Sequence, residues 1–395
     1  MNILYISNKP IYPLIDGGCI AMNQFLKCLL KAGYNVKHFT VSTHKHTYSE
    51  TEYPIALNSI IHTESSFIDT RINPFSALAY IFKKGSYNID RFKSSRFRSK
   101  LKSHLKNNKV DIVIFESIYL ASYFSVVKKY STAKTIIRSH NVEYEIWERL
   151  AENEAFFLKK IYFKKLAKDL KKAELSIINK TDGIISITFE DEKKLLKYGV
   201  KIPLTTIPVS IESQSLNCDY LVNSFFHIGS MNWLPNLEAV NNLINNIFPK
   251  IRLKIPTAKL YLGGSFMPDT IQTSESEGII VEGFINNVPN FITSNGIMLA
   301  PIKSGSGVRV KILESMSFGV PIVTTKIGIE GIHSTNGTDI MIANTEDEFI
   351  QNAIELSLSK EIRESIGRNA KKNIEENYQT EVITKKLIEF IKKIS

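Results

Sequence analysis

The segment from Ser304 to Pro321, SGSGVRVKILESMSFGVP, has the residue types and the spacing of an anion-binding site. Apolar runs flank this segment, which predicts a strand, a glycine loop, a helix and a second strand. Gly305 and Gly307 would let the loop backbone approach a ligand closely. Arg309 and Lys311 fall in the expected first turn of the helix, where the helix dipole disfavours cations. Two cations there indicate that an anion such as a phosphate binds at this helix end.

Glu314 follows Lys311 by one helical turn and should lie on the same side of the helix. A carboxylate at this place can accept hydrogen bonds from two sugar hydroxyls. Phosphate donors and a hydroxyl acceptor one turn apart predict a site for a nucleotide diphosphate. The alternative is a solvated surface pair between Lys311 and Glu314, which stabilises a helix by only a few tenths of a kcal/mol.

Two further positions follow predicted strands in the first half of the chain. Gly17 and Gly18 come after the apolar run Asn2–Ser7, and His140 comes after the apolar run Lys134–Arg138. Ligands of open parallel sheets bind beyond the carboxyl ends of the strands, so we expect these residues to face a ligand. A simple turn at the two glycines and a structural role for the histidine are the alternatives.

The elements that would position these residues form two successive series of strand and helix patterns. A chain of 395 residues is too long for one ordinary core. Repeated strand–helix alternation predicts parallel sheets. We therefore expect an α/β fold with two Rossmann-like parallel-sheet domains facing each other across a cleft, over residues 1–210 and 211–375. One long helix is expected over about residues 143–178, and residues 45–75 are expected to be irregular.

The composition is that of a soluble globular protein, with 43% hydrophobic and 23% charged residues. No apolar run approaches the length needed to span a bilayer, and the first residues lack the pattern of a secretory signal. The three cysteines are sparse and lack metal-ligand spacing, which fits a reducing cytoplasm. We therefore expect a cytoplasmic protein.

The formal net charge of +11 favours anionic partners such as nucleotides, nucleic acids or an anionic membrane face. No nucleic-acid-binding module is present in the sequence, so we do not expect a nucleic acid partner. Much of the positive charge lies in residues 91–109 and 156–172, where lysines and arginines alternate with apolar residues at helical spacing. Such segments are either helices that lie on an anionic membrane surface or ordinary amphipathic helices with a solvated basic face.

Several motifs together resemble the retaining, nucleotide-sugar-dependent glycosyltransferases of family 4, which have the GT-B fold. The motifs run over nearly the whole chain: GG at 17–18, SHNVE at 139–143, GSMNWLPN at 229–236, EGF at 282–284, LAPIKSGSGVRVKILESMSFGVPIVTT at 299–325, and GIEGI at 328–332. The resemblance implies an acceptor-binding first domain and a nucleotide-sugar-binding second domain. A final helix over residues 376–395 is expected to cross back and pack on the first domain.

The resemblance also implies roles for single residues. Glu314 matches the second glutamate of the family's E-x7-E pattern, which binds the ribose hydroxyls, whereas Ser306 stands where the first glutamate contacts the donor sugar. His140 is placed beside the donor sugar, where it would bond a hydroxyl or steady the developing oxocarbenium ion. The residues expected at the donor are Gly17, Gly18, Ser230, Gly305, Ser306, Gly307, Val308 and Glu314.

The chain departs from the family's pattern after the first strand of the second domain. The usual phosphate-binding arginine and lysine are missing there, and the loop reads Ser230, Met231, Asn232, Trp233. We expect Arg309 and Lys311 to supply the missing positive charge and to stabilise the leaving nucleoside diphosphate. No Asp-x-Asp pair follows a strand, so no metal and no other cofactor is expected.

The predicted reaction is the transfer of a sugar, with retention, from a nucleotide diphosphate-sugar to a hydroxyl of a glycan or lipid-linked acceptor. Cell-surface polysaccharide, lipopolysaccharide or glycoconjugate synthesis is the expected setting, with contact to the inner face of the membrane as an option. The alternatives are a non-catalytic protein of the same fold that binds nucleotide sugars and a GT-B enzyme that catalyses a different step.

Overall fold

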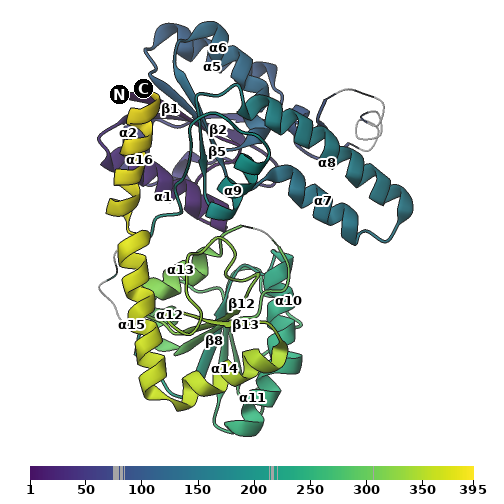
Figure 1. Ribbon diagram of the computed structural model, residues 1–395, viewed down its shortest axis with the longest axis vertical. Helices are drawn as coiled ribbons and strands as arrows, with labels where there is room; N and C mark the ends of the chain where they lie inside the picture. The colour runs from purple at the N-terminus through teal and green to yellow at the C-terminus, as the bar shows by residue number, and fades with distance from the viewer. Residues whose placement is uncertain are drawn as a thin grey trace. The chain divides into compact units, whose positions relative to one another are not determined.

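The computed structural model describes residues 1–73, 80, 83, 85–212, 214, 218–219, 221–305 and 307–395 (Figure 1). The chain divides into two compact units. The first comprises Met1–Pro208 and Thr384–Ser395, and the second comprises Val209–Ile383. Each unit is a parallel sheet flanked by helices, which confirms the predicted α/β fold with two Rossmann-like domains.

The first unit contains a seven-stranded parallel sheet with the order β3-β2-β1-β4-β5-β6-β7. Its strands are β1 (Asn2–Ser7), β2 (Asn35–Ser42), β3 (Glu64–Phe67), β4 (Ile112–Phe115), β5 (Lys134–Ser139), β6 (Gly183–Ser186) and β7 (Leu204–Thr206). The central strands are nearly continuous apolar runs because helices cover both faces of the sheet. Strand β3 lies within the stretch expected to be irregular. Its sequence, ESSF, is short and polar, as suits an edge strand.

Most helices of the first unit pack against this sheet. The unit's described helices are α1 (Gly17–Lys31), α2 (Ile55–Ile61), α4 (Tyr87–Asp90), α5 (Ser95–Asn107), α6 (Phe124–Tyr130), α7 (Glu143–Asn153), α8 (Phe157–Ile178) and α9 (Phe189–Lys197). On α5, Phe97, Leu101 and Leu105 are buried in the core. The basic segment 91–109 therefore contains an ordinary amphipathic helix with a solvated basic face. Among the described residues, no helix combines the length and apolarity needed to cross a membrane.

The single long helix expected over residues 143–178 is instead the pair α7 and α8, which lie side by side as a hairpin (Figure 1). The chain leaves the helical conformation at Glu154 and re-enters it at Phe157. Trp147 and Phe163 then meet with their rings 5.7 Å apart and nearly perpendicular. A continuous helix would hold these two aromatic residues apart, so their packing accounts for a break that the sequence periodicity does not show.

The second unit contains a six-stranded parallel sheet with the order β10-β9-β8-β11-β12-β13. Its strands are β8 (Ser224–Ile228), β9 (Lys259–Gly263), β10 (Ile279–Gly283), β11 (Ile297–Ala300), β12 (Ile322–Thr325) and β13 (Met341–Ala343). Its helices are α10 (Leu234–Asn242), α11 (Phe248–Lys254), α12 (Val288–Ser294), α13 (Val310–Ser317), α14 (Glu346–Leu358) and α15 (Lys360–Asn377). A π-helical turn, Leu243–Ile247, joins α10 to α11.

The last helix, α16 (Thr380–Ile394), begins in the second unit and ends in the first. Leu387, Phe390 and Ile391 are buried. A side chain added at Gly183, the first residue of β6, would lie 2.9 Å from the Phe390 ring. The end of the chain therefore packs on the first sheet.

The strand order reverses direction once in each sheet. In the first sheet the reversal falls between β1 and β4, and in the second it falls between β8 and β11. Loops that leave neighbouring strands at such a point diverge to opposite faces of the sheet, which opens a crevice at the carboxyl ends. These two points are where a ligand site is expected.

Two backbones approach each other closely beside the second of these points. Gly264 has φ +142°, and a Cβ atom at this residue would lie 1.6 Å from the carbonyl oxygen of Gly229. We expect Gly264→Ala to lower the melting temperature of the second unit by more than about 8 °C, because backbone must move to admit the methyl group.

The matched control for this variant is Gly337→Ala. Gly337 also has a positive φ, +73°, but no atom lies within 4 Å of the added Cβ. The control variant is destabilised only by the left-handed backbone conformation that alanine must adopt, so its melting temperature should fall by about 2–4 °C. Equal melting temperatures for the two variants, measured by scanning calorimetry, would contradict the steric argument.

The amino end of α7 is capped by a residue from α8. Val142, which precedes α7, offers no side-chain cap. The carboxyl oxygens of Glu174 accept hydrogen bonds from the backbone nitrogens of Glu143 and Tyr144, each at 3.3 Å. Burial, together with the nearby Glu143 carboxylate, raises the pKa of Glu174 to about 8. A buried acid that stays protonated thus holds the two helices together.

The free energy of unfolding of the first unit should depend on pH through Glu174. Glutamate in an unfolded chain has a pKa of about 4.3, so between that pH and about 8 the folded chain keeps a proton that the unfolded chain has lost. The contribution of Glu174 to the free energy of unfolding is therefore complete below about pH 4. It falls by up to about 1.4 kcal/mol per pH unit as the pH rises toward 8. Urea unfolding at several pH values should show Glu174→Gln flattening this slope. The control Glu148→Gln, at a half-exposed residue of α7, should keep it, and equal slopes in both variants would contradict the assignment.

Candidate functional site

The loops after β8 and β11 meet at the point where the second sheet reverses its strand order. A Cβ atom at Gly305 would lie 2.8 Å from the indole ring of Trp233, and the guanidinium carbon of Arg309 lies 5.6 Å from the centre of that ring. Gly305 and Gly307 have φ of +90° and +87°, a left-handed conformation that favours glycine. The sequence therefore folds the glycine loop against the loop that begins at Gly229.

Arg309 does not lie in the first turn of α13, as expected, but directly before it. Its side chain is only 7% exposed and turns back on its own loop. The guanidinium donates hydrogen bonds to the carbonyl oxygens of Gly307 and, at 3.4 Å, of Ser304, and it lies 3.9 Å from Glu330. Arg309 thus holds the loop through these two carbonyl groups and places a positive charge next to it.

Lys311 and Glu314 form an ion pair of 2.7 Å on the first turn of α13. Both side chains are half-buried, so the pair sits at the edge of the site. The groups that the sequence assigns to a phosphate and to a ribose therefore satisfy each other in this structure. The ion pair between Lys311 and Glu314, given above as the alternative to a ligand site, is therefore present at the site itself.

Two more residues expected at the donor, Ser230 and Val308, lie in the loops after β8 and β11. Ser230 contacts Ser265 through their hydroxyl oxygens at 2.8 Å and donates a hydrogen bond to Asn232 at 2.9 Å. Val308 is half-buried, and its carbonyl oxygen accepts from Val310 at 3.1 Å. Ser306 lies outside the described residues.

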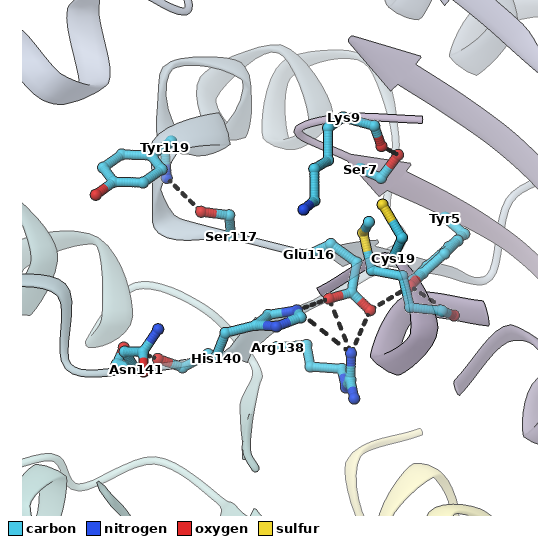
Figure 2. A network of polar contacts seen from close by, with 12 residues as sticks. Tyr5, Ser7, Lys9, Cys19, Glu116, Ser117, Tyr119, Arg138, His140 and Asn141 are labelled. Atoms are coloured by element: carbon cyan, nitrogen blue, oxygen red, sulfur yellow. Dashed lines mark hydrogen bonds and ion pairs between the residues drawn. The ribbon is translucent and has the colours of Figure 1, made fainter. Parts of the chain in front are cut away.

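A buried ionic cluster occupies the corresponding point of the first sheet (Figure 2). Glu116 follows β4, and Arg138 and His140 come from the carboxyl end of β5. The guanidinium of Arg138 lies 2.8 Å and 3.0 Å from the two carboxylate oxygens of Glu116. The His140 Nε2 atom and the Tyr5 hydroxyl also hydrogen bond to this carboxylate.

The charges of this cluster keep Glu116 ionised although it has no exposed surface. Burial would raise its pKa, but the positive charge of Arg138 and the contact with His140 outweigh burial and lower the pKa to about 2. Glu116, Arg138 and Tyr5 are fully buried, whereas the side chain of His140 is 22% exposed. His140 is therefore the member of the cluster that can reach a ligand.

Sequence analysis missed Glu116 and gave Arg138 no role at the site. Glu116 ends the apolar run DIVIF, so it reads as the polar residue at which a buried strand stops. A signal was nevertheless available, because the carboxyl end of this strand lies beside the point where the first sheet reverses its order.

Gly17 and Gly18 are the first residues of α1, and the side chain of Lys9 lies close to Gly18. Asp16 caps this helix by accepting from the backbone nitrogen of Cys19 at 2.8 Å, and its carboxylate oxygens lie 2.7 Å and 2.6 Å from Lys9 Nζ. A Cβ atom at Gly18 would lie 2.9 Å from that nitrogen. Burial would raise the pKa of Asp16, but Lys9 lowers it to about 2. The absence of a side chain at Gly18 thus leaves room for the end of the Lys9 side chain over the start of the helix.

Comparison with known proteins gives one family match and one curated relative. Residues 223–358 match the family described as "Glycosyl transferases group 1". An "Uncharacterized 44.6 kDa protein in cps region" of Klebsiella pneumoniae is 27% identical over 300 residues, which cover 72% of this chain and 75% of that protein.

Solved structures of similar fold cover the whole chain at low sequence identity. Sucrose-phosphate synthase from Thermosynechococcus elongatus has a TM-score of 0.71 at 12% identity, covering 100% of this chain and 99% of that one. Anabaena Alr3699/HepE in complex with UDP has a TM-score of 0.65 at 11% identity, covering 100% of both chains. The pneumococcal O-GlcNAc transferase GtfA in complex with UDP and GlcNAc has a TM-score of 0.65 at 14% identity, covering 99% of both chains. The second unit therefore carries a match to the group 1 glycosyl transferases over residues 223–358, and the chain has the GT-B fold.

Proposed function

We propose that this chain is a glycosyltransferase that moves a sugar from a nucleoside diphosphate-sugar to an acceptor hydroxyl. The observation that carries the proposal is the position of the family match. Residues 223–358 include both loops that meet at the reversal of the second sheet, together with Lys311 and Glu314. The matched segment therefore holds the predicted donor site as well as the sheet that builds it.

The comparisons support a uridine nucleotide as the donor's carrier and a polysaccharide as the product. Two of the similar structures are complexes with UDP, and the Klebsiella relative comes from a cps region. We propose UDP-sugar as the donor and a glycan or lipid-linked acceptor in cell-surface polysaccharide synthesis. All three cysteines are buried and form no disulfide, which is consistent with the reducing cytoplasm that we propose as the location.

In the proposed donor site, Lys311 binds the diphosphate and Glu314 binds the ribose hydroxyls. Their ion pair has to open, or Glu314 has to share its second oxygen, when the nucleotide binds. We assign the stabilisation of the leaving group's negative charge to the backbone amides of Gly305 and Gly307 and to Arg309, whose guanidinium binds the carbonyl oxygens of Ser304 and Gly307. This arrangement stabilises a nucleoside diphosphate leaving group without a metal ion, so we propose a metal-independent transfer.

We assign to His140 the contact with the donor sugar and to Glu116 the positioning of its ring. Because the ionised Glu116 accepts from Nε2, that nitrogen carries the proton and Nδ1 is left for a sugar hydroxyl. We propose transfer with retention, in which the leaving phosphate takes the acceptor proton on the same face of the sugar. No separate base is then required.

The residue at position 306 supports a second candidate function. Ser306 replaces the glutamate that the family uses at the donor sugar, so the chain can instead be a protein of this fold that binds nucleotide sugars without transferring them, or that catalyses another step. UDP release from a panel of UDP-sugars separates the two functions, because a pure binding protein shows affinity without turnover.

Nucleotide affinity should depend on the pair at the start of α13. We expect Lys311→Ala and Glu314→Gln each to weaken UDP binding by about 10- to 150-fold, because each removes a charge-assisted hydrogen bond. Isothermal titration calorimetry with UDP measures this change. Lys360 and Glu364 form a more exposed lysine–glutamate pair on α15 and provide the controls Lys360→Ala and Glu364→Gln, which should bind as the wild type does. Unchanged affinity in the α13 variants would overturn the donor site.

Turnover should depend on His140 more than affinity does. We expect His140→Ala to lower kcat for UDP release by about 100-fold or more while UDP affinity stays within about twofold, because the ring acts on the sugar and not on the nucleotide. His44→Ala is the control, since His44 is an exposed histidine of the same unit. A variant at His140 that loses UDP affinity in step with kcat, or loses neither, would contradict this role.

A further inference from the structure

We propose that the end of the α7–α8 hairpin docks on the surface of an anionic phospholipid bilayer. The hairpin runs out from the first sheet, and the connection between its helices lies at the far end (Figure 1). Three consecutive large apolar side chains occupy this connection and the start of α8. Phe156, Phe157 and Leu158 are 62%, 69% and 66% exposed.

The exposure of these residues is not explained by packing within the hairpin. The packed side of α8 is formed by residues such as Phe163, Leu166 and Leu170, which contact Trp147 or the core. Phe157 and Ile161 lie one turn apart on another side of α8, and Ile161 is exposed as well. The hairpin therefore has a second apolar surface at its end, in addition to the surface that holds it together.

A regular row of lysines begins at this apolar end and continues along α8. Lys160, Lys164, Lys168 and Lys172 are spaced four residues apart, so they lie along one side of α8. None of these four lysines forms an ion pair with another residue in the described parts of the chain. The segment from Phe156 to Lys172 holds seven lysines and one acidic residue, Asp169.

Three acidic side chains of the hairpin pair with lysines that do not belong to this row. On α7, Glu145 lies 2.8 Å from Lys194, and Glu154 in the connection lies 2.5 Å from Lys159. On α8, Asp169 pairs with Lys165. The row of lysines therefore carries positive charge that these three carboxylates do not neutralise, and the row begins beside the exposed aromatic rings. Apolar side chains that enter the headgroup layer next to lysines that meet anionic headgroups are the features of a peripheral membrane site.

Helix α5 shows that basic character alone does not produce this surface. It belongs to the other basic segment of the chain, yet its apolar residues Phe97, Leu101 and Leu105 are buried in the core. Its outer side is polar and carries lysines and arginines among serines. The two basic segments have similar sequence patterns but differ in the structure. The first contains an ordinary amphipathic helix, and the second leaves apolar side chains exposed beside its lysines.

A bilayer is the occupant that the charges favour over a second copy of this chain. The chain has a formal net charge of +11, so two copies repel each other, and the hairpin's end would meet another basic surface. An anionic bilayer supplies both the opposite charge and an apolar layer. Docking would hold the first unit at the surface where a lipid-linked acceptor lies, but the docking itself does not rest on the proposed transfer.

The test is co-sedimentation of the full-length protein with vesicles. We expect binding to vesicles that contain phosphatidylglycerol and phosphatidylcholine, weak binding to phosphatidylcholine alone, and release by salt. Phe156→Ser, Phe157→Ser and Leu158→Ser in one chain should weaken binding by about tenfold or more. The matched control replaces three other exposed apolar residues of the first unit, Ile55, Ile60 and Leu196, with serine and should bind as the wild type does.

A second variant tests the charges. Lys164→Gln, Lys168→Gln and Lys172→Gln should weaken binding to the anionic vesicles only. Equal binding of the wild type and the serine variant, or no binding to either kind of vesicle, would overturn the proposal. A wild-type dimer that the serine variant converts to a monomer, without vesicle binding, would show that a second copy covers the surface and would also overturn it. UDP binding in solution should be the same in all these variants, so failure of this proposal is distinct from failure of the proposed function.

Discussion

The parallel direction of every strand is the constraint on which the rest of this molecule depends. Because all strands of a sheet run the same way, their carboxyl ends meet at one edge, and reversal of the strand order opens a crevice there. In the second unit this edge joins the loop of Trp233 to the loop of Gly305. In the first unit it joins Glu116 to His140. Residues that are more than 20 positions apart thus become neighbours without any special local sequence.

Sequence reasoning predicted the features that depend on local residue types. The glycine loop was identified because it follows an apolar run that forms a strand, and Lys311 and Glu314 because of their spacing on the helix that comes next. His140 was identified from its place after a strand together with the family resemblance. Glu116 and the break between α7 and α8 were not. Both depend on partners that are distant in sequence: the carboxylate on Arg138 and His140, and the break on the contact of Trp147 with Phe163. A periodicity argument contains no information about such partners.

The Glu116 cluster of the first sheet and the Lys311–Glu314 pair of the second differ in burial. Glu116 has no exposed surface, and its donors hold it ionised, so removing one partner would leave a buried charge unpaired. The side chains of Lys311 and Glu314 are both partly exposed to solvent, where separating two charges costs little. A fixed cluster suits the orientation of an imidazole ring, and a separable pair suits a site that has to admit and release a charged ligand.

The last helix places a condition on the order of folding during synthesis. Residues 384–395 belong to the first unit, and Phe390 packs on the start of β6. The ribosome, however, makes the whole second unit before these residues emerge. The hydrophobic surface of the first unit therefore stays partly uncovered until residues 384–395 have been made, and a chain that lacks these residues would keep every residue of the second unit but leave the first unit incomplete.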